Sequence, residues 1–178
     1  MILNDIALRQ RAIEGLVSPL TLSNVQASSI DLTLGNTIKV EAPVGTGGDW
    51  FEVDLTEQGY ALDPGEFILA HTAETVAIPE DCCAMVLLRS SAARAGYEHS
   101  LAGWCDPGFG LGNPSQITLE LRNNLRFRHL PVKAGMRLCQ LVVHKLEAVP
   151  EQLYAVRGSY QGQMGVTASN NNFTREAA

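Results

Sequence analysis

The sequence has few basic residues and no long apolar run, and these two absences exclude several classes of protein. Lysine and arginine number 13 against 19 aspartates and glutamates, which gives a formal net charge of −6. Binding along the phosphate backbone of DNA or RNA needs dense basic side chains, so we expect no nucleic-acid partner. No apolar stretch reaches the length of a membrane span, and Asp5 and Arg9 lie where a signal peptide would be apolar. We therefore expect a cytoplasmic protein without membrane association.

Several well-known site motifs are also missing. The chain contains no G-x-x-x-x-G-K-[ST] phosphate loop, no G-x-G-x-x-G fingerprint and no G-x-S-x-G nucleophile elbow. The H-x-E and P-C-x-x-C signature of zinc deaminases is absent, and the cysteines form no C-x-x-C pair. We expect no protein-bound metal, catalytic zinc included, and buried reduced thiols at Cys82, Cys83, Cys105 and Cys139.

Glycine and proline, in contrast, are frequent. The 16 glycines and 8 prolines interrupt the 178 residues every few positions, a pattern that favours many short strands over long helices. The length suits one compact domain, which we place at residues 1–169, followed by a flexible tail at 170–178. One short helix is expected at residues 4–15, where Asn4 can cap the start and Gly15 can end it. The remainder predicts a mainly all-β fold with a closed or sandwiched arrangement of strands.

Period-two apolar patterns predict where the strands lie. Strands at 30–34 and 38–40 are expected to pair with each other across a turn at Gly35 and Asn36. Further strands are expected at residues 51–55, 66–71, 75–78, 84–88, 116–122 and 137–146.

Residues 89–96, RSSAARAG, leave a predicted strand and form a short helical turn. The free N–H groups of such a turn, together with the serine hydroxyls and Arg89, can hold a phosphate. Ser90 and Arg94 are four residues apart and share a face of the turn. The alternative is a capped surface helix with a solvated arginine.

Residues 99–109, HSLAGWCDPGF, read as a strand that enters a Pro-Gly hairpin. Asp106 either lies at the tip of that hairpin, beside a binding cleft, or only caps the turn before proline. His99 has no partner at metal-binding spacing and is interpreted as a hydrogen-bonded structural histidine.

Residues 116–123, QITLELRN, alternate between apolar and polar positions. Ile117, Leu119 and Leu121 share one face of the predicted strand. Glu120 lies on the other face, where it either lines a cleft as a proton acceptor or faces solvent.

Four segments taken in order carry a resemblance to a known family. They are residues 26–35 (QASSIDLTLG), 89–96, 102–109 (AGWCDPGF) and 117–120 (ITLE), and together they resemble the dCTP deaminases and trimeric dUTPases. The resemblance implies a distorted β-barrel or jelly-roll-like subunit of the dUTPase type with a short N-terminal helix. It also implies a homotrimer with active sites between subunits and chemistry that is independent of zinc.

The resemblance further implies roles for individual residues. Glu120 would activate the water that attacks C4 of cytosine, and Ser90 and Arg94 would orient that water and the carboxylate. Asp106 matches the residue that helps water to attack the triphosphate in bifunctional members, and Mg²⁺ would be bound through the triphosphate. The nucleotide-binding residues implied are Arg89, Ser91, Ala102, Trp104, Thr118, Tyr154, Ser159, Tyr160 and Gln163.

The expected activity is hydrolytic deamination of dCTP to dUTP and ammonia in pyrimidine deoxynucleotide metabolism. The segment Ala102-Gly103-Trp104 resembles the bifunctional branch, in which dUTP continues to dUMP and diphosphate. Two departures from the family pattern are a longer segment at 110–116 and Ser159 at a position where a phosphate-binding lysine is common; Arg157 could substitute for that lysine. The alternatives are a dUTP diphosphatase without deaminase activity and a catalytically silent nucleotide-binding regulator.

Overall fold

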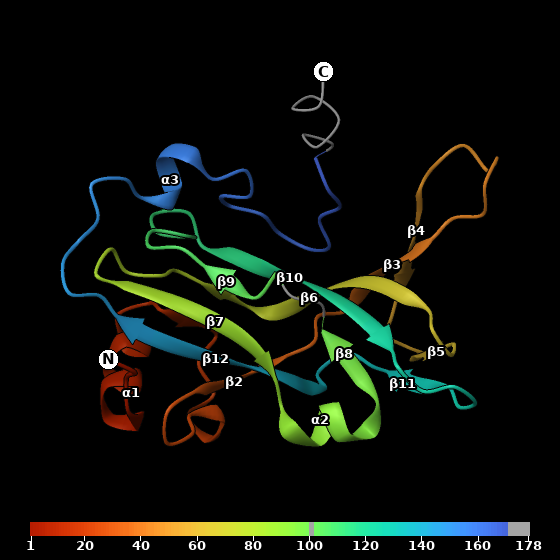
Figure 1. Cartoon of the computed structure of the whole chain (residues 1–178), viewed down its shortest axis with the longest axis horizontal. Helices are drawn as coiled ribbons and strands as arrows, with labels where there is room; N and C mark the ends of the chain where they lie inside the picture. Colours follow the sequence, from red (N-terminus) through yellow and green to blue (C-terminus); the bar gives the residue numbers. More distant parts are fainter. Residues whose placement is uncertain (100–101, 171–178) are drawn as a thin grey trace.

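The computed structural model describes residues 1–99 and 102–170, and these form a mainly β protein (Figure 1). The predicted all-β class with a short N-terminal helix is confirmed. Residues 171–178 of the predicted tail lie outside the described residues. In the described part of the chain, no helix is long and apolar enough to cross a membrane. The helical elements are α1 (Asp5–Ile13), the 3-10 turn η1 (Leu22–Asn24), α2 (Ser90–Ala95) and α3 (Tyr154–Arg157).

The strands form three sheets rather than one closed barrel within the described residues. The largest sheet has the order β4-β3-β6-β10-β8, with β1 added to β6; the second has the order β2-β12-β7-β9, and β11 pairs with β5. The strands are β1 (Val17–Ser18), β2 (Ile30–Thr33), β3 (Thr37–Glu41), β4 (Trp50–Asp54), β5 (Tyr60–Leu62), β6 (Phe67–Val76), β7 (Cys82–Leu88), β8 (Tyr97–His99), β9 (Trp104–Cys105), β10 (Ser115–Asn123), β11 (Leu130–Val132) and β12 (Arg137–Lys145).

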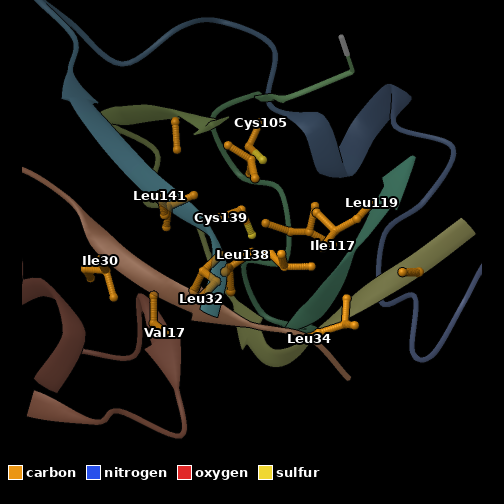
Figure 2. Packing of buried hydrophobic residues seen from close by; sticks show 14 of the residues in the cluster. Val17, Ile30, Leu32, Leu34, Cys105, Ile117, Leu119, Leu138, Cys139 and Leu141 are labelled. Carbon is orange, nitrogen blue, oxygen red and sulfur yellow. The ribbon is translucent and has the colours of Figure 1, made fainter. Parts of the chain in front are cut away.

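The core lies between the two larger sheets. Figure 2 shows side chains of β2 and β12, among them Leu32 and Leu141, directed toward Ile117 and Leu119 of β10. All four cysteines are buried free thiols that form no disulfide, as the sequence predicts. Burial of this apolar surface is the main favourable term that holds the two sheets together.

The helix α1 forms for the local reasons that its sequence suggests. The Asn4 side chain accepts a hydrogen bond from the Ala7 N–H (3.0 Å), and the helix ends before Gly15, whose φ of +102° is a conformation that favours glycine. Leu8 and Ala12 are its buried residues. The prediction of a helix at 4–15 is thus confirmed to within two residues at its C-terminal end.

Two predictions of strand pairing are wrong. β2 and β3 do not pair with each other; β2 pairs with β12, whereas β3 pairs with β4 and β6. The chain crosses between the sheets at this point, since the Leu34 N–H donates to Met136 O (2.9 Å) and the Gly35 N–H donates to His71 O (2.7 Å). Likewise β9 is not one arm of a hairpin at residues 106–109, because it pairs with β7 while the chain continues into β10 of the other sheet.

The crossing at Gly35 requires the absence of a side chain. A Cβ atom at this position would lie 2.1 Å from Cε1 of the His71 ring. That ring is buried and fixed by Thr37 Oγ1 (3.1 Å) on Nε2 and by Thr72 O (2.9 Å) on Nδ1, so it has no room to move.

We therefore expect Gly35→Ala to destabilise the protein by about 3 kcal/mol, because overpacking in a rigid site forces the backbone and the ring apart. Urea denaturation would measure the loss. Gly48→Ala is the matched control, since a Cβ there meets nothing within 4 Å and the stability should be unchanged. Equal stability of the two variants would contradict this account of the crossing.

Candidate active site

Strand β10 provides the central carboxylate of the candidate site. Its residues alternate between buried and partly exposed positions, with Ile117, Leu119 and Leu121 in the core. Thr118 and Glu120 lie on the opposite face, as the period-two pattern predicts. Glu120 pairs with Leu69 of β6 on one side, and the pairing of β10 with β8 on the other side begins at the next residue, Leu121, opposite His99.

A groove of about 520 Å³ opens on the Thr118 and Glu120 face of β10. Trp50, Phe67, Leu69 and Phe109 give it largely apolar and aromatic walls. Such a cleft with a few polar groups is the usual form of a small-molecule site. The residues that the sequence predicts at a nucleotide site and that line this groove are Ala102, Trp104, Asp106, Thr118, Glu120, Tyr154, Tyr160 and Gln163.

The C-terminal part of the described chain forms one side of the groove. Residue Gln163 is joined to Gln116 at the start of β10 by two hydrogen bonds, from Gln116 N–H to Gln163 O (2.9 Å) and from Gln163 Nε2 to Gln116 O (2.7 Å). The Tyr160 N–H donates to the Tyr154 hydroxyl (3.1 Å), and the Tyr154 ring packs edge-on against Phe109 at 5.1 Å between centroids. These contacts hold Tyr154, Tyr160 and Gln163 at the groove despite their distance in sequence from β10.

The unusually long segment 110–116 is tied to the same part of the chain. Gln161 accepts a hydrogen bond from the Gly110 N–H (3.0 Å) and donates to Leu111 O (3.1 Å), while the Gly162 N–H donates to Ser115 Oγ (2.8 Å). The longer loop therefore packs on the C-terminal segment.

Asp106 lies at the rim of the groove, where the chain passes from β9 to β10. Its Oδ1 accepts a hydrogen bond from Trp104 Nε1 (2.8 Å), and both side chains are exposed. The indole thus orients a carboxylate that still faces solvent and can contact a ligand.

Glu120 has the electrostatic setting of a proton acceptor. Its side chain is 26% exposed, and Oε2 is a buried atom with no hydrogen-bond partner among the described residues. Burial raises the pKa of Glu120. The Thr118 hydroxyl, also on this face, is likewise unpartnered in the described part of the chain. Unsatisfied polar atoms beside a groove are commonly satisfied by a ligand or water.

The sequence interpretation of His99 as a hydrogen-bonded structural residue is incomplete. The side chain is only 3% exposed, and its Nδ1 lies 3.9 Å from Glu120 Oε2. Neither ring nitrogen has a hydrogen-bond partner among residues 1–99 and 102–170. Burial lowers the pKa of His99, which favours the neutral ring at pH 7. Pairing of β8 with β10 creates this proximity, and no local pattern in the sequence signals it.

The phosphate-binding residues predicted at 89–96 lie in a different part of the structure. Ser90, Ser91 and Arg94 are exposed on the short helix α2, which lies beside β8 at the lower edge of the view in Figure 1, whereas α3 lies at the upper edge. Neither they nor Arg89 are among the residues that line the groove, and the exposed Ser159 is not either. The described part of the chain therefore brings Glu120 together with the other predicted residues that line the groove, but Arg94 does not line it.

Comparison with known proteins places the chain in a family. The family described as dCTP deaminase-like matches residues 2–146. A protein named "dCTP deaminase, dUMP-forming" from Sulfurihydrogenibium sp. is 41% identical over 182 residues, covering 95% of this chain and 96% of the relative. One of the same name from Aquifex aeolicus is 38% identical over 185 residues, covering 99% and 98%.

A solved structure agrees with these relatives. The crystal structure of 2'-deoxycytidine 5'-triphosphate deaminase from Agrobacterium tumefaciens superposes with a TM-score of 0.65 at 25% identity, and the match covers 81% of this chain and 48% of that one. Strand β10 and the two glycine-containing segments at 89–96 and 102–109 lie inside the matched family region, whereas Tyr154, Tyr160 and Gln163 of the groove follow it. The chain belongs to the dCTP deaminase-like family.

Proposed function

We propose that the protein deaminates dCTP and converts the product to dUMP. Relatives that span nearly the whole chain carry the name "dCTP deaminase, dUMP-forming". The observation that carries the proposal is the Glu120 carboxylate, which has an unpartnered oxygen and lies on a rigid strand in a groove with aromatic walls. A pyrimidine ring can stack in such a groove with its C4 directed toward β10.

In the deamination step, Glu120 takes a proton from a water molecule whose oxygen bonds to C4 of cytosine. Glu120 delivers this proton to the ring nitrogen N3, which keeps it. Glu120 then transfers the proton of the new C4 hydroxyl to the amino group, the C4–N bond breaks, ammonia leaves and the C4 carbonyl of uracil forms. The raised pKa of Glu120 makes the carboxylate a stronger base toward water than an exposed glutamate. The reaction as proposed does not depend on zinc, since the carboxylate activates the water.

The second step is hydrolysis of dUTP to dUMP and diphosphate. Asp106 is the carboxylate at the rim of the groove, and the Trp104 indole holds its Oδ1. We propose that Asp106 orients the water molecule that attacks the α-phosphorus. Glu120 and Asp106 thus serve two different reactions of one bound nucleotide.

The remaining predicted residues are supplied, in this proposal, by a neighbouring subunit. Ser90 and Arg94 on α2 orient the water and the carboxylate of Glu120, while Arg89 and Ser91 bind phosphate oxygens. Ser90, Ser91 and Arg94 are exposed and Arg89 is partly exposed, which leaves them available for this contact. A homotrimer with sites between subunits satisfies the requirement. The exposed Ser159, and Arg157 two residues before it, would flank the phosphates.

Magnesium enters with the substrate. Mg²⁺ prefers phosphate oxygens and water, with one or two carboxylates from the protein. The exposed carboxylate of Asp106 at the rim fits that donor set. We propose that Mg²⁺ is bound through the triphosphate, where it would offset phosphate charge.

Product analysis separates the two steps. We expect Glu120→Gln to lower ammonia release from dCTP by about a thousandfold, because an amide cannot accept the proton. Asp106→Asn should still release ammonia from dCTP but accumulate dUTP.

Both variants can be tested by chromatography of the products formed from dCTP and from dUTP. The reactions would contain Mg²⁺, after other metals have been removed with a chelator. Turnover of dUTP alone by the wild type would instead indicate a dUTP diphosphatase, and tight binding without turnover a regulator.

The Glu120→Gln variant, which is expected to lose activity, should gain stability. Glu120→Gln removes a carboxylate that burial disfavours, so we expect the free energy of unfolding at pH 7 to rise by on the order of 1 kcal/mol. Because the folded-state pKa of Glu120 is raised, the gain is fully present above that pKa and disappears below the ordinary value of 4.5, where the group is neutral in both states. Urea titrations from pH 4 to pH 8 would test this. A gain independent of pH would contradict the assignment.

A further inference from the structure

The buried carboxylate of Asp31 is the centre of a cluster of polar side chains. Apart from Arg89, the members of this cluster have no role in the proposed reaction. Asp31 lies on β2, and its side chain is 1% exposed. Oδ1 is 3.3 Å from Arg89 Nε, and Oδ2 is 3.7 Å from Arg137 Nη1 and accepts a hydrogen bond from Gln26 Nε2 (3.4 Å). An acidic group so deeply buried would be costly without these partners.

Strand pairing in the smaller sheet fixes this geometry. β12 lies between β2 and β7, with Gln140 opposite Asp31 and Cys139 opposite Leu88. Arg137 is the first residue of β12, and Arg89 follows the last residue of β7, where its N–H donates to Leu138 O (2.9 Å). The two guanidinium groups therefore approach Asp31 from adjacent strands whose backbones are paired through β12.

The charges in the cluster do not cancel. Two guanidinium groups share one carboxylate, which leaves a single positive charge. The Arg89 side chain is 31% exposed and that of Arg137 47% exposed, so both have N–H groups that face outward. Arg89 Nη1 also donates to Arg137 O (3.4 Å), which links the two arginines directly. A planar guanidinium in a fixed orientation is well suited to bidentate binding of a phosphate.

We propose that Arg137 binds the triphosphate of the substrate together with Arg89, and that Asp31 positions both arginines. This inference rests on the proposed function, in which Arg89 and the adjacent serines contact phosphate. It adds Arg137 as a binding residue and Asp31 as a positioning residue. The alternative is that both arginines serve only to neutralise Asp31.

The test uses the full-length protein and the half-exposed Arg137. We expect Arg137→Gln to raise KM for dCTP about tenfold or more while kcat stays within about twofold, because a phosphate contact is lost and the reacting ring is not touched. Inorganic triphosphate, used as a competitive inhibitor, should lose affinity by a similar factor, whereas binding of deoxycytidine should not change. Arg137→Lys should recover part of the loss, since it keeps the charge but not the fork of donors. Arg126→Gln is the matched control, at an exposed arginine that stacks on Phe127.

A positioning role for Asp31 predicts that the two changes are not additive. In an Asp31→Asn background, Arg137→Gln should raise KM by much less than in the wild type, because the arginine is already released. A structural role alone would lower stability without this coupling.

The outcomes separate the inference from the proposed function. If the wild type deaminates dCTP and Arg137→Gln leaves KM and the affinity for inorganic triphosphate unchanged, the inference is wrong. If the wild type has no activity on dCTP but binds inorganic triphosphate in a manner that depends on Arg137, the inference stands and the proposed function fails.

Discussion

The site depends on the alternation of side chains along β10. One face of this strand carries Ile117, Leu119 and Leu121 into the core between the sheets, so a shift by one residue would exchange buried leucines for a buried carboxylate. The apolar face therefore fixes the register of the polar face. Glu120 is placed in the groove by the packing of its neighbours, and it receives no hydrogen bond on Oε2 from the described residues. The fold thus holds in place a carboxylate whose Oε2 atom receives no hydrogen bond from the described residues.

This arrangement explains why the environment of Glu120 is apolar on one side and open on the other. Burial raises its pKa, and the nearby His99, whose pKa burial lowers, adds little positive charge that would stabilise the carboxylate at neutral pH. A strongly paired glutamate would be a weak base, because an ion pair stabilises its ionised form. Among residues 1–99 and 102–170 no lysine or arginine forms an ion pair with Glu120, which is consistent with a group that accepts protons.

How much of this could be read from the sequence depends on whether the signal is local. The alternation at 117–121, the cap at Asn4 and the short helix after β7 are local patterns, and each predicts the observed element. The pairing of β2 with β12 joins segments about a hundred residues apart, and a turn sequence at Gly35 suggested a hairpin instead. The crossing occurs where Gly35 packs against the His71 ring. The residues around Gly35 in the sequence do not indicate this contact. The proximity of His99 to Glu120 is hidden for the same reason.

The division of charge between the two sheets bears on how an acidic protein can bind a triphosphate. The carboxylates of the groove are Glu120, on β10 of the larger sheet, and Asp106, which follows β9 of the smaller sheet, while Arg89 and Arg137 lie around Asp31 at the smaller sheet. If both sets of groups faced one another within a subunit, the arginines would pair with Glu120 and Asp106 and leave less charge for phosphate. Instead Asp31 occupies one side of each guanidinium and leaves the other side exposed. In the proposed function a net charge of −6 is then no obstacle, because the field at bound phosphates would be set by groups within about one Debye length.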